Sequence, residues 1–285
     1  ATLKEAIVKG AEVLVLGIAP SGGKIPESWN PVIEEALDNK MSIVNGLHDV
    51  LNERWSHLIK NPLKQWIWDV RIPLFTPEIA TGKASQLQNK RVLFIGTDMA
   101  VGKMTAGLEL YSWLLEHKKK VGFVATGQIG ITITGKGIPL DAFKVDHACG
   151  AVEQVVLDQA DKDIILIEGQ GSLLHPGSTA TLPLMRGSCP THLILCLRAE
   201  KKTLRSPEHI KIPDLNDFIA LNESLASVFG TFSRSRVIGI AANTSMLSES
   251  EAKAYLSKTS KHTGLVTTDP IRYGIATIGE KILMS

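Results

Sequence analysis

One segment in the first half of the chain constrains the fold more than any other. Residues 92–95 form an apolar run, a glycine-flanked turn from Gly96 to Gly102 follows, and Lys103 opens a stretch with a helical pattern. Glycines let successive main-chain N–H groups point at one anion, a helix presents the positive end of its dipole there, and a lysine adds a full charge. The segment therefore predicts a strand, a phosphate-binding loop and a helix, which together indicate an α/β domain.

The spelling of this loop is more informative than its presence. Five residues separate Gly96 from Gly102, where the strict Walker A pattern has four, and Met104 stands where an NTPase normally places the hydroxyl that coordinates Mg²⁺. The longer spelling resembles the Gly-Thr-Asp-x-x-Val-Gly-Lys loop of dethiobiotin synthetase and its P-loop relatives. The loop is therefore expected to hold phosphate without a metal ligand, while the alternative is a glycine turn that binds nothing. The predicted phosphate contacts are Gly96, Thr97, Asp98, Ala100, Val101, Gly102, Lys103, Met104 and Thr105.

Composition sets the class of protein and its partners. With 285 residues, 44% of them hydrophobic and 5% aromatic, the chain suits two domains with buried parallel strands. A net charge of +2 and a single short basic run, residues 117–120 at an expected helix end, argue against nucleic acid. The three cysteines predict core or near-core thiols of a reducing compartment. Without an apolar span or a signal peptide, the sequence predicts a cytoplasmic protein that does not enter a membrane.

Helix and strand patterns alternate along the chain, as in α/β domains. Helices are expected at residues 2–9, 28–39, 103–117, 146–159, 213–227 and 249–259, and strands at 12–17, 42–45, 91–95, 121–125, 163–167, 192–197, 237–242 and 265–267. Residues 1–72 are expected to form a first α/β domain, 73–90 a linker, and 91–285 the second domain. Because a helix precedes the first strand, the chain is expected to begin inside its first domain. Trp55, Trp66 and Trp68 are expected to pack in the core or at a domain interface.

A second group of candidate residues follows the strand expected at 163–167. That strand delivers Glu168, two glycines, Ser172 and His175 to one loop, and this loop resembles the Glu-Gly-x-Gly segment that faces the phosphate loop in the same P-loop branch. Glu168 is the predicted active-site carboxylate, or else it caps the following turn. His175 can transfer protons near neutral pH, but a histidine before proline is often structural.

Further polar residues are predicted to contact the substrate. Residues 126–137 are rich in glycine and threonine and follow a strand, so they form either a ligand loop or an ordinary flexible connection. Asn243 and Thr244 contact a base or cap a strand. Arginines are expected to clamp carboxylates. The predicted substrate contacts are Thr126, Gly127, Gln128, Gln170, Gly171, Ser172, Arg186 and Arg272, with Arg198 as a further candidate clamp.

Several motifs together resemble the DgcN-like family. In chain order they are residues 17–23, 44–49, 67–71, 96–105, 125–128, 168–173 with His175-Pro176, and 268–270. The resemblance covers nearly the whole chain and implies a Rossmann-like amino-terminal domain, here incomplete, followed by a P-loop domain with a mostly parallel sheet. It also implies an N-acyltransferase that moves an acetyl group from acetyl-CoA to the amine of a small acidic amino acid such as D-glutamate.

In this interpretation the phosphate loop holds the donor phosphates, Glu168 or His175 removes a proton from the amine, and N–H groups from Gly169 to Ser172 stabilise the oxyanion. Two alternatives stay open. One is an ATP-dependent ligase or kinase of the dethiobiotin synthetase class, in which Thr105 or Glu168 recruits Mg²⁺. The other is a nucleotide-binding sensor without turnover. The expected partners are a small-molecule substrate and further copies of the chain in a homo-oligomer.

Overall fold

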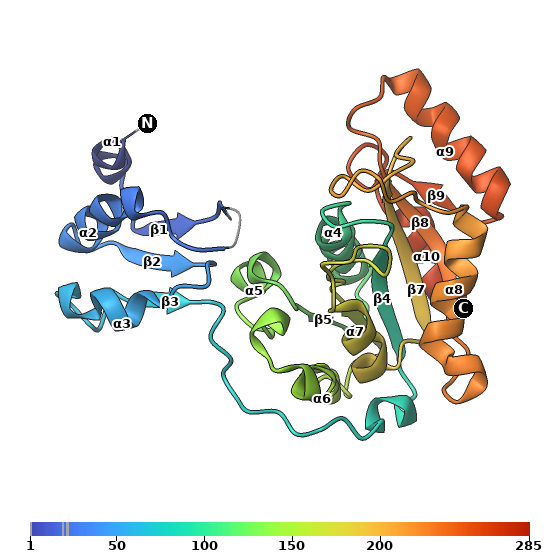
Figure 1. The fold of residues 1–285 in the computed structure, drawn as a ribbon, viewed down its shortest axis with the longest axis horizontal. Coiled ribbons are helices and arrows are strands. Elements are labelled where there is room, and N and C mark those ends of the chain that lie inside the picture. Colours follow the sequence, from blue (N-terminus) through green and yellow to red (C-terminus); the bar gives the residue numbers. More distant parts are fainter. Residues whose placement is uncertain (1, 19, 21–22) are drawn as a thin grey trace. The chain divides into compact units, whose positions relative to one another are not determined.

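Two parallel sheets organise the computed structural model, which describes residues 2–18, 20 and 23–285 (Figure 1). Residues 1–75 and 127–142 form one compact unit, and residues 76–126 and 143–285 form the other. Ala19, Ser21 and Gly22 of the motif at 17–23 lie outside the described residues. The α/β class expected from the sequence is confirmed. No helix in the described part of the chain is long and apolar enough to cross a membrane.

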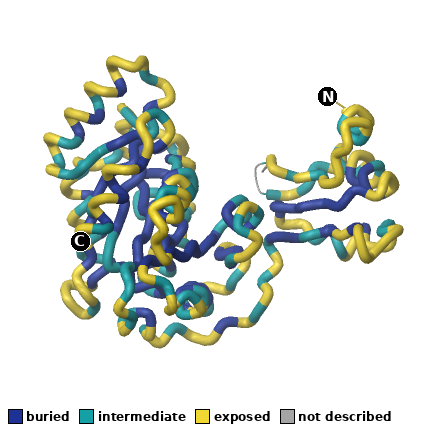
Figure 2. Tube along the Cα trace, turned by 180° about the vertical axis from the view of Figure 1, so that it is seen from behind, coloured by how far each residue is buried: buried dark blue, intermediate teal, exposed yellow. Residues whose placement is uncertain are grey.

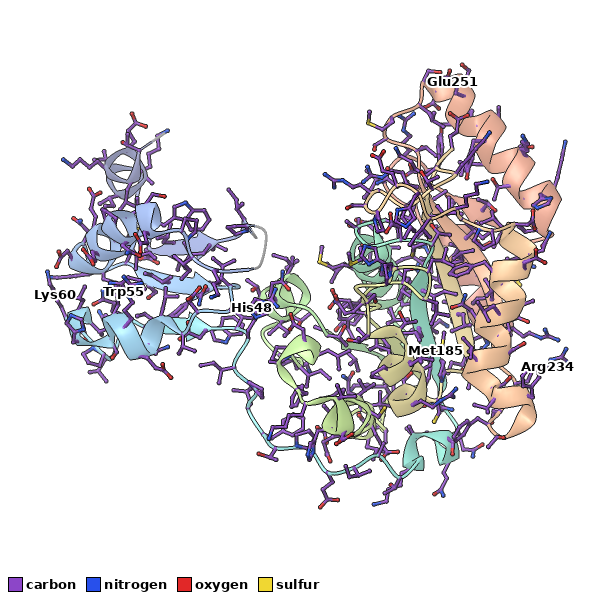
Figure 3. The ribbon with its side chains drawn as sticks, viewed as in Figure 1. His48, Trp55, Lys60, Met185, Arg234 and Glu251 are labelled. Atoms are coloured by element: carbon purple, nitrogen blue, oxygen red, sulfur yellow. The ribbon has the colours of Figure 1, made fainter. Side chains whose placement is uncertain are left out.

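The first unit is built on a parallel sheet with the strand order β1-β2-β3. Its strands are β1 (Val13–Leu16), β2 (Ser42–Asn45) and β3 (Ile67–Asp69), and its helices are α1 (Leu3–Val8), α2 (Asn30–Asp38), α3 (Leu51–Trp55) and α5 (Gln128–Thr134), with 3₁₀ turns at Glu27–Trp29, Ser56–Leu58 and Leu140–Ala142. Ile33 and Leu37 of α2, Ile43 of β2 and Trp55 of α3 belong to one buried hydrophobic core. Trp55 is 3% exposed and packs in this core, as expected (Figure 3), whereas Trp66 is 43% exposed and does not.

Neither α3 nor β3 is expected from the sequence, and the reason is a contact between them. The residue before α3, Val50, has no side chain that could cap the helix. Instead, the buried carboxylate of Asp69 at the end of β3 accepts the N–H groups of Leu51 and Asn52, at 2.9 and 3.0 Å. The Asn45 side-chain amide donates to the same carboxylate at 2.8 Å. The short helix and the short strand therefore stabilise each other, and neither has a clear pattern alone.

Residues 128–134 form the helix α5, whereas both interpretations of the segment 126–137 expect a loop. Gly135 ends this helix with a left-handed φ of 73°, as glycine commonly does. Glycine and β-branched threonine have low intrinsic helix propensity, which is why the pattern indicates a loop. Contacts within the unit compensate: the Gln128 side chain packs against Gly46, and Asp141 forms an ion pair with Arg71.

The second unit contains a parallel sheet with the strand order β5-β6-β4-β7-β8-β9. The strands are β4 (Lys90–Gly96), β5 (Val121–Val124), β6 (Ile164–Ile167), β7 (His192–Arg198), β8 (Arg236–Asn243) and β9 (Thr267–Thr268). The helices are α4 (Lys103–Glu116), α6 (Val145–Leu157), α7 (Thr181–Ser188), α8 (Leu215–Ser227), α9 (Glu249–Thr263) and α10 (Ala276–Met284), with 3₁₀ turns at Lys83–Gln86 and Val228–Gly230. The sequence does not predict α7 or α10. Figure 2 shows the centre of this unit buried, and β4, β6 and β7 are buried except at their end residues, as expected for aliphatic parallel strands.

Helices cover both faces of this sheet. The chain leaves β4 toward β5 in one direction and passes from β6 to β7 in the other, so right-handed crossovers place α4 and α7 on opposite faces. In agreement, α4 packs with α10, whereas α7 packs with α6 and α8 (Figure 1). The strand order therefore reverses at β4, and ligands of open α/β sheets bind at the carboxyl ends of the strands near such a point.

The structure agrees with the expected positions of the basic run and of the cysteines. The basic run at 117–120 follows α4, with His117 as its C-cap residue. All three cysteines are free, with Cys189 and Cys196 buried and Cys149 half-buried.

A buried arginine fixes the other end of β4. Arg91 is 1% exposed, and its guanidinium donates to the main-chain oxygens of Ser188 and Cys189 at 3.1 and 3.0 Å. It also donates to the oxygens of Leu87 and Asn89, both at 2.9 Å. One side chain thus satisfies carbonyls at the start of β4 and at the end of α7.

We expect Arg91→Met to lower the free energy of unfolding of this unit by about 3–5 kcal/mol, because buried carbonyls lose a charged donor. Urea denaturation measures this difference. Arg234→Met is the matched control, since Arg234 is exposed (Figure 3) and its replacement should change stability by no more than about 0.5 kcal/mol. Equal denaturation midpoints for the two variants would contradict the role of Arg91.

Candidate functional site

The loop between β4 and α4 presents free main-chain N–H groups at the carboxyl end of the central strand. Ala100 and Gly102 adopt left-handed conformations, with φ of 53° and 104°. No side chain caps α4, and among the described residues none accepts a hydrogen bond from the N–H groups of residues 100–105. These donors lie at the positive end of a 14-residue helix. The arrangement is an anion-binding nest of the kind that holds phosphate groups.

Lys103 lies within this nest and is nearly buried. Its side chain is 6% exposed, and Nζ donates to the main-chain oxygen of Asp98 at 2.9 Å. Burial lowers the pKa of Lys103, while Cys196, Asp98 and Glu168 act in the opposite direction. A Cβ at position 96 would lie 3.0 Å from Nζ, so Gly96 leaves room for the ammonium group. The acceptor of the Nζ hydrogen bond is a neutral carbonyl and not a carboxylate, so the charge of the ammonium group remains available to bind an anion.

Asp98 shapes the loop through main-chain contacts. One carboxylate oxygen, Oδ1, accepts the N–H group of Met99 at 2.7 Å, and the other, Oδ2, accepts the N–H group of Arg205 at 2.7 Å. Thr97 adds a main-chain bond from its N–H group to the oxygen of Cys196 in β7, at 3.1 Å. Asp98 therefore joins the phosphate loop to the segment that follows β7.

Glu168 stands directly after β6, the neighbour of β4. It is 3% exposed, and Oε2 accepts the N–H group of Thr126 at 2.8 Å. Thr126 Oγ1 in turn donates to the main-chain oxygen of Glu168 at 2.8 Å. A Cβ at Gly169 would lie only 1.6 Å from the Phe94 oxygen and 3.0 Å from Lys103 Cδ, so the two loops meet at a position that only glycine can occupy. Glu168 thus both caps the end of β5 and lies beside Lys103.

A cavity of about 420 Å³ opens over the nest. It is lined by residues 99–105, by residues 168–171 and by Asn243. The structure therefore brings together most of the predicted phosphate contacts and the predicted carboxylate. Among the described residues, no group of three or more His, Cys, Asp or Glu side chains could hold a metal ion.

A second cavity of about 350 Å³ adjoins the first and shares Val101, Gly102, Thr105 and Asn243 with it. Its wall is mostly apolar and includes Pro270 and Ile271. Asp269 supports this wall: its carboxylate accepts N–H groups from Thr244, Ile271 and Arg272. Burial alone would raise the pKa of Asp269, but these hydrogen bonds together hold it below its usual value. The paired cavities therefore offer room for an apolar group attached to a phosphate.

Arg186 does not lie at this site, which corrects the expectation that it binds substrate. It belongs to the last turn of α7, just before β7, and therefore lies at the amino-terminal edge of the sheet. Figure 3 labels the preceding residue, Met185. Its guanidinium donates to the Leu225 oxygen at 2.6 Å and stacks 5.8 Å from the centre of the Phe232 ring. The phosphate loop lies at the opposite edge, because all strands of this sheet are parallel.

Arg272 and Ser172 also differ from expectation. Arg272 lines the second cavity, but its guanidinium is held by the Leu247 oxygen at 2.5 Å and by Glu249 at 3.6 Å. Ser172 is 1% exposed, and its N–H group donates to Ser178 Oγ at 3.1 Å. Ser172 therefore stabilises its own turn and cannot offer that N–H group to a ligand, which leaves residues 169–171 as the part of the loop that lines the cavity.

His175 has both ring nitrogens in hydrogen bonds. A carbonyl oxygen can only accept, so the contact of 2.6 Å with the Ser206 oxygen requires the proton on Nε2. The lone pair of Nδ1 accepts the N–H group of Gly177 at 3.1 Å. His175 in this state connects two loops and has no free lone pair for a substrate proton.

The remaining predicted contacts divide between the two units. Thr126 is held by Glu168 in the second unit. Gly127 and Gln128 belong to the first unit, and the Gln128 side chain packs against Gly46 there.

Asn243, which is expected from the sequence to contact a base or to cap a strand, lines both cavities. It ends a strand of a parallel sheet, and the carboxyl ends of such strands share one edge. Lys201 and Arg205 are not expected from the sequence and lie beside the loop. Arg205 lies far along an irregular segment, so only the fold reveals it.

Fold and site together define a P-loop protein of the α/β class, and the comparisons with known proteins agree. Residues 78–279 match the P-loop domain of unknown function DUF1611, and residues 1–73 match its Rossmann-like amino-terminal domain. The chain therefore belongs to the DUF1611 family, which confirms the resemblance seen in its motifs.

Similar proteins match most of the chain. It is 37% identical to a D-glutamate N-acetyltransferase of a Pseudoalteromonas species, over 96% of this chain and 82% of that protein. A D-glutamate N-acetyltransferase of Tritonibacter scottomollicae is likewise 37% identical, over 96% of this chain and 81% of that protein. The crystal structure of a DUF1611 family protein from Anabaena variabilis is 44% identical, with a TM-score of 0.95, and covers 100% of this chain and 83% of that one.

We expect the nest to bind inorganic pyrophosphate, and Gly102→Ala to weaken this binding about tenfold. A Cβ at position 102 meets no atom within 4 Å, but a φ of 104° strains any L-residue and would distort the loop. Isothermal titration calorimetry measures the affinity. Gly264→Ala is the matched control, because Gly264 also has a positive φ (71°) and open space but ends α9. The same affinity in both variants would argue against the nest.

Proposed function

We propose that this chain is an N-acetyltransferase that moves an acetyl group from acetyl-CoA to the amine of a small acidic amino acid such as D-glutamate. The observation that carries the proposal is an open phosphate nest with Met104 at the position of the usual metal-binding hydroxyl. Acyl transfer needs the donor phosphates held but needs no metal-assisted phosphoryl transfer. The names of the two curated relatives support the same reaction and the same acceptor.

The residues present fit a CoA nucleotide. The N–H groups of residues 100–105 and the Lys103 ammonium group match the charge of a diphosphate. The adjoining cavity of about 350 Å³, with Pro270 and Ile271 in its mostly apolar wall, has room for a base. Thr105 and Asn243 lie at the junction of the two cavities, where a ribose would connect base and diphosphate.

Glu168 is the proposed general base. It accepts a proton from the acceptor's amine as the amine nitrogen bonds to the acetyl carbonyl carbon, and it returns a proton to sulfur when the C–S bond breaks. Main-chain N–H groups of residues 169–171 stabilise the oxyanion that forms between these events. Glu168 is preferred to His175 because it lines the cavity, whereas both nitrogens of His175 are occupied. We further propose that the enzyme acts in the cytoplasm as a homo-oligomer, as the sequence predicts.

The first test concerns the donor. Lys103→Met should weaken acetyl-CoA binding about 10- to 100-fold, since charged hydrogen bonds to phosphate are lost while the volume of the side chain is nearly kept. Calorimetric titration measures this affinity. Lys119→Met removes the same charge from an exposed position and should bind acetyl-CoA like the wild type. Wild-type binding of ATP that tightens with Mg²⁺, together with release of ADP, would instead support the phosphoryl-transfer class.

The second test concerns the base. Glu168→Gln should lower kcat for acetylation of D-glutamate by a factor of about 10² to 10⁴ and leave the KM for acetyl-CoA within about twofold. The amide oxygen of glutamine can still accept the Thr126 N–H group, so the fold should persist. His175→Asn is the comparison variant. A large kcat loss in this variant alone would assign the proton transfer to His175 and contradict the proposed role of Glu168.

A further inference from the structure

The segment between β7 and α8 carries cations to the phosphate loop. Arg198, Lys201 and Arg205 line a small cavity of about 100 Å³, together with Ile212 and residues 97–101 of the loop itself. Met99, Ala100 and Val101 also line the cavity over the nest, so the two spaces share a wall. The small cavity, called the cation pocket below, is therefore next to the proposed donor site without being part of it.

The charges of the cation pocket are not neutralised within the described chain. Among the described residues, no carboxylate forms an ion pair with Arg198, Lys201 or Arg205. Asp98 is the carboxylate in the pocket wall, and both of its oxygens already accept main-chain N–H groups. The pocket thus has three cationic side chains against one carboxylate, which favours an anionic occupant.

The segment that carries these cations is ordered by its own main-chain contacts. Thr203 pairs with Lys211 in an antiparallel bridge, Leu204 is 1% exposed, and the Leu204 N–H group donates to the Ile210 oxygen at 3.0 Å. The Arg205 N–H group donates to Asp98 at 2.7 Å, and the Arg198 guanidinium reaches the Ala100 oxygen at 3.4 Å. The main chain that carries these cations is therefore ordered before any ligand binds, which reduces the entropy lost on binding.

The same segment lies against the loop that follows β6. The Ser206 oxygen, next to Arg205 in the chain, accepts the Nε2 proton of His175 at 2.6 Å. His175 belongs to the loop that begins with Glu168. A ligand in the cation pocket would thus contact the phosphate loop and the segment that bonds to the Glu168 loop.

From this geometry we infer that Arg198, Lys201 and Arg205 bind the carboxylates of the acceptor, so that these side chains select a dicarboxylic amino acid. The inference rests on the proposed function and replaces Arg186 and Arg272 as the expected clamp. The size of the pocket supports it, since about 100 Å³ accommodates a short carboxylate-bearing arm and is far smaller than the 300–1,000 Å³ of sites for larger ligands. Arginine and lysine are the usual partners of such carboxylates.

The test uses the double variant Lys201→Ala/Arg205→Ala. Both side chains are exposed, and the Arg205 N–H group that holds Asp98 is kept, so the fold should persist. The matched control is Lys119→Ala/Arg234→Ala, which removes one exposed lysine and one exposed arginine that do not line the cation pocket or the groove that shares Arg198 and Lys201 with it. We expect the KM for D-glutamate to rise about 10- to 100-fold in the test variant, with the KM for acetyl-CoA within about twofold. The control should match the wild type in both.

Two kinetic outcomes would overturn the inference. One is an unchanged KM for D-glutamate in the test variant. The other is a rise in the KM for acetyl-CoA that disappears with 3′-dephospho-acetyl-CoA, because the pocket would then bind the donor's phosphate.

Binding of glutarate, a dicarboxylate without an amine, separates this inference from the proposed function. Titration should show that the test variant binds glutarate at least about tenfold more weakly than the wild type and the control. If the wild type binds glutarate in this way but forms no N-acetylated product, the pocket stands and the proposed reaction is wrong. If the wild type acetylates D-glutamate and the test variant does so with the same KM, the reaction stands and the assignment of the pocket is wrong.

Discussion

The site depends on one electrostatic arrangement: a buried ammonium group beside main-chain N–H groups for which the described residues supply no acceptor. Lys103 Nζ bonds to a neutral carbonyl, and burial lowers its pKa, so the folded chain keeps this charge at a cost. An anion in the nest would accept hydrogen bonds from the N–H groups of residues 100–105 and would also compensate the buried charge of Lys103. The reversal of strand order at β4 puts this arrangement where the sheet leaves space for a ligand.

The walls of the site are fixed by main-chain hydrogen bonds from polar side chains. Asp98 holds the N–H group of Arg205, Glu168 holds that of Thr126, and His175 donates to the Ser206 oxygen. Each contact joins the ends of two different strands or their following segments. Asp98, Glu168 and His175 therefore have a structural role in addition to any role in catalysis or binding. For this reason the sequence around Glu168 or His175 is consistent with either role.

The predictions that succeeded concern elements whose stability is local. β4, the glycine turn and α4 have a hydrophobic run, glycines at positive φ and a helical pattern in one continuous stretch. The errors concern elements stabilised from a distance. The helix α5 forms in a segment of low helix propensity, and α3 is capped by Asp69 from β3. In both cases a contact with a residue far along the chain outweighs the local preference. The sequence does not predict α7, so it also does not show that Arg186 lies just before β7, at the amino-terminal edge of the sheet.

The sequence by itself determined the α/β class, the position of the P-loop and the family, because these follow from contiguous residues whose spacing fixes their geometry. Only the tertiary structure decided which charged side chains share the edge of the sheet with that loop. Arg186 and Arg205 are equally basic in sequence, yet one lies before a strand and the other after one. In a parallel sheet that difference places them at opposite edges.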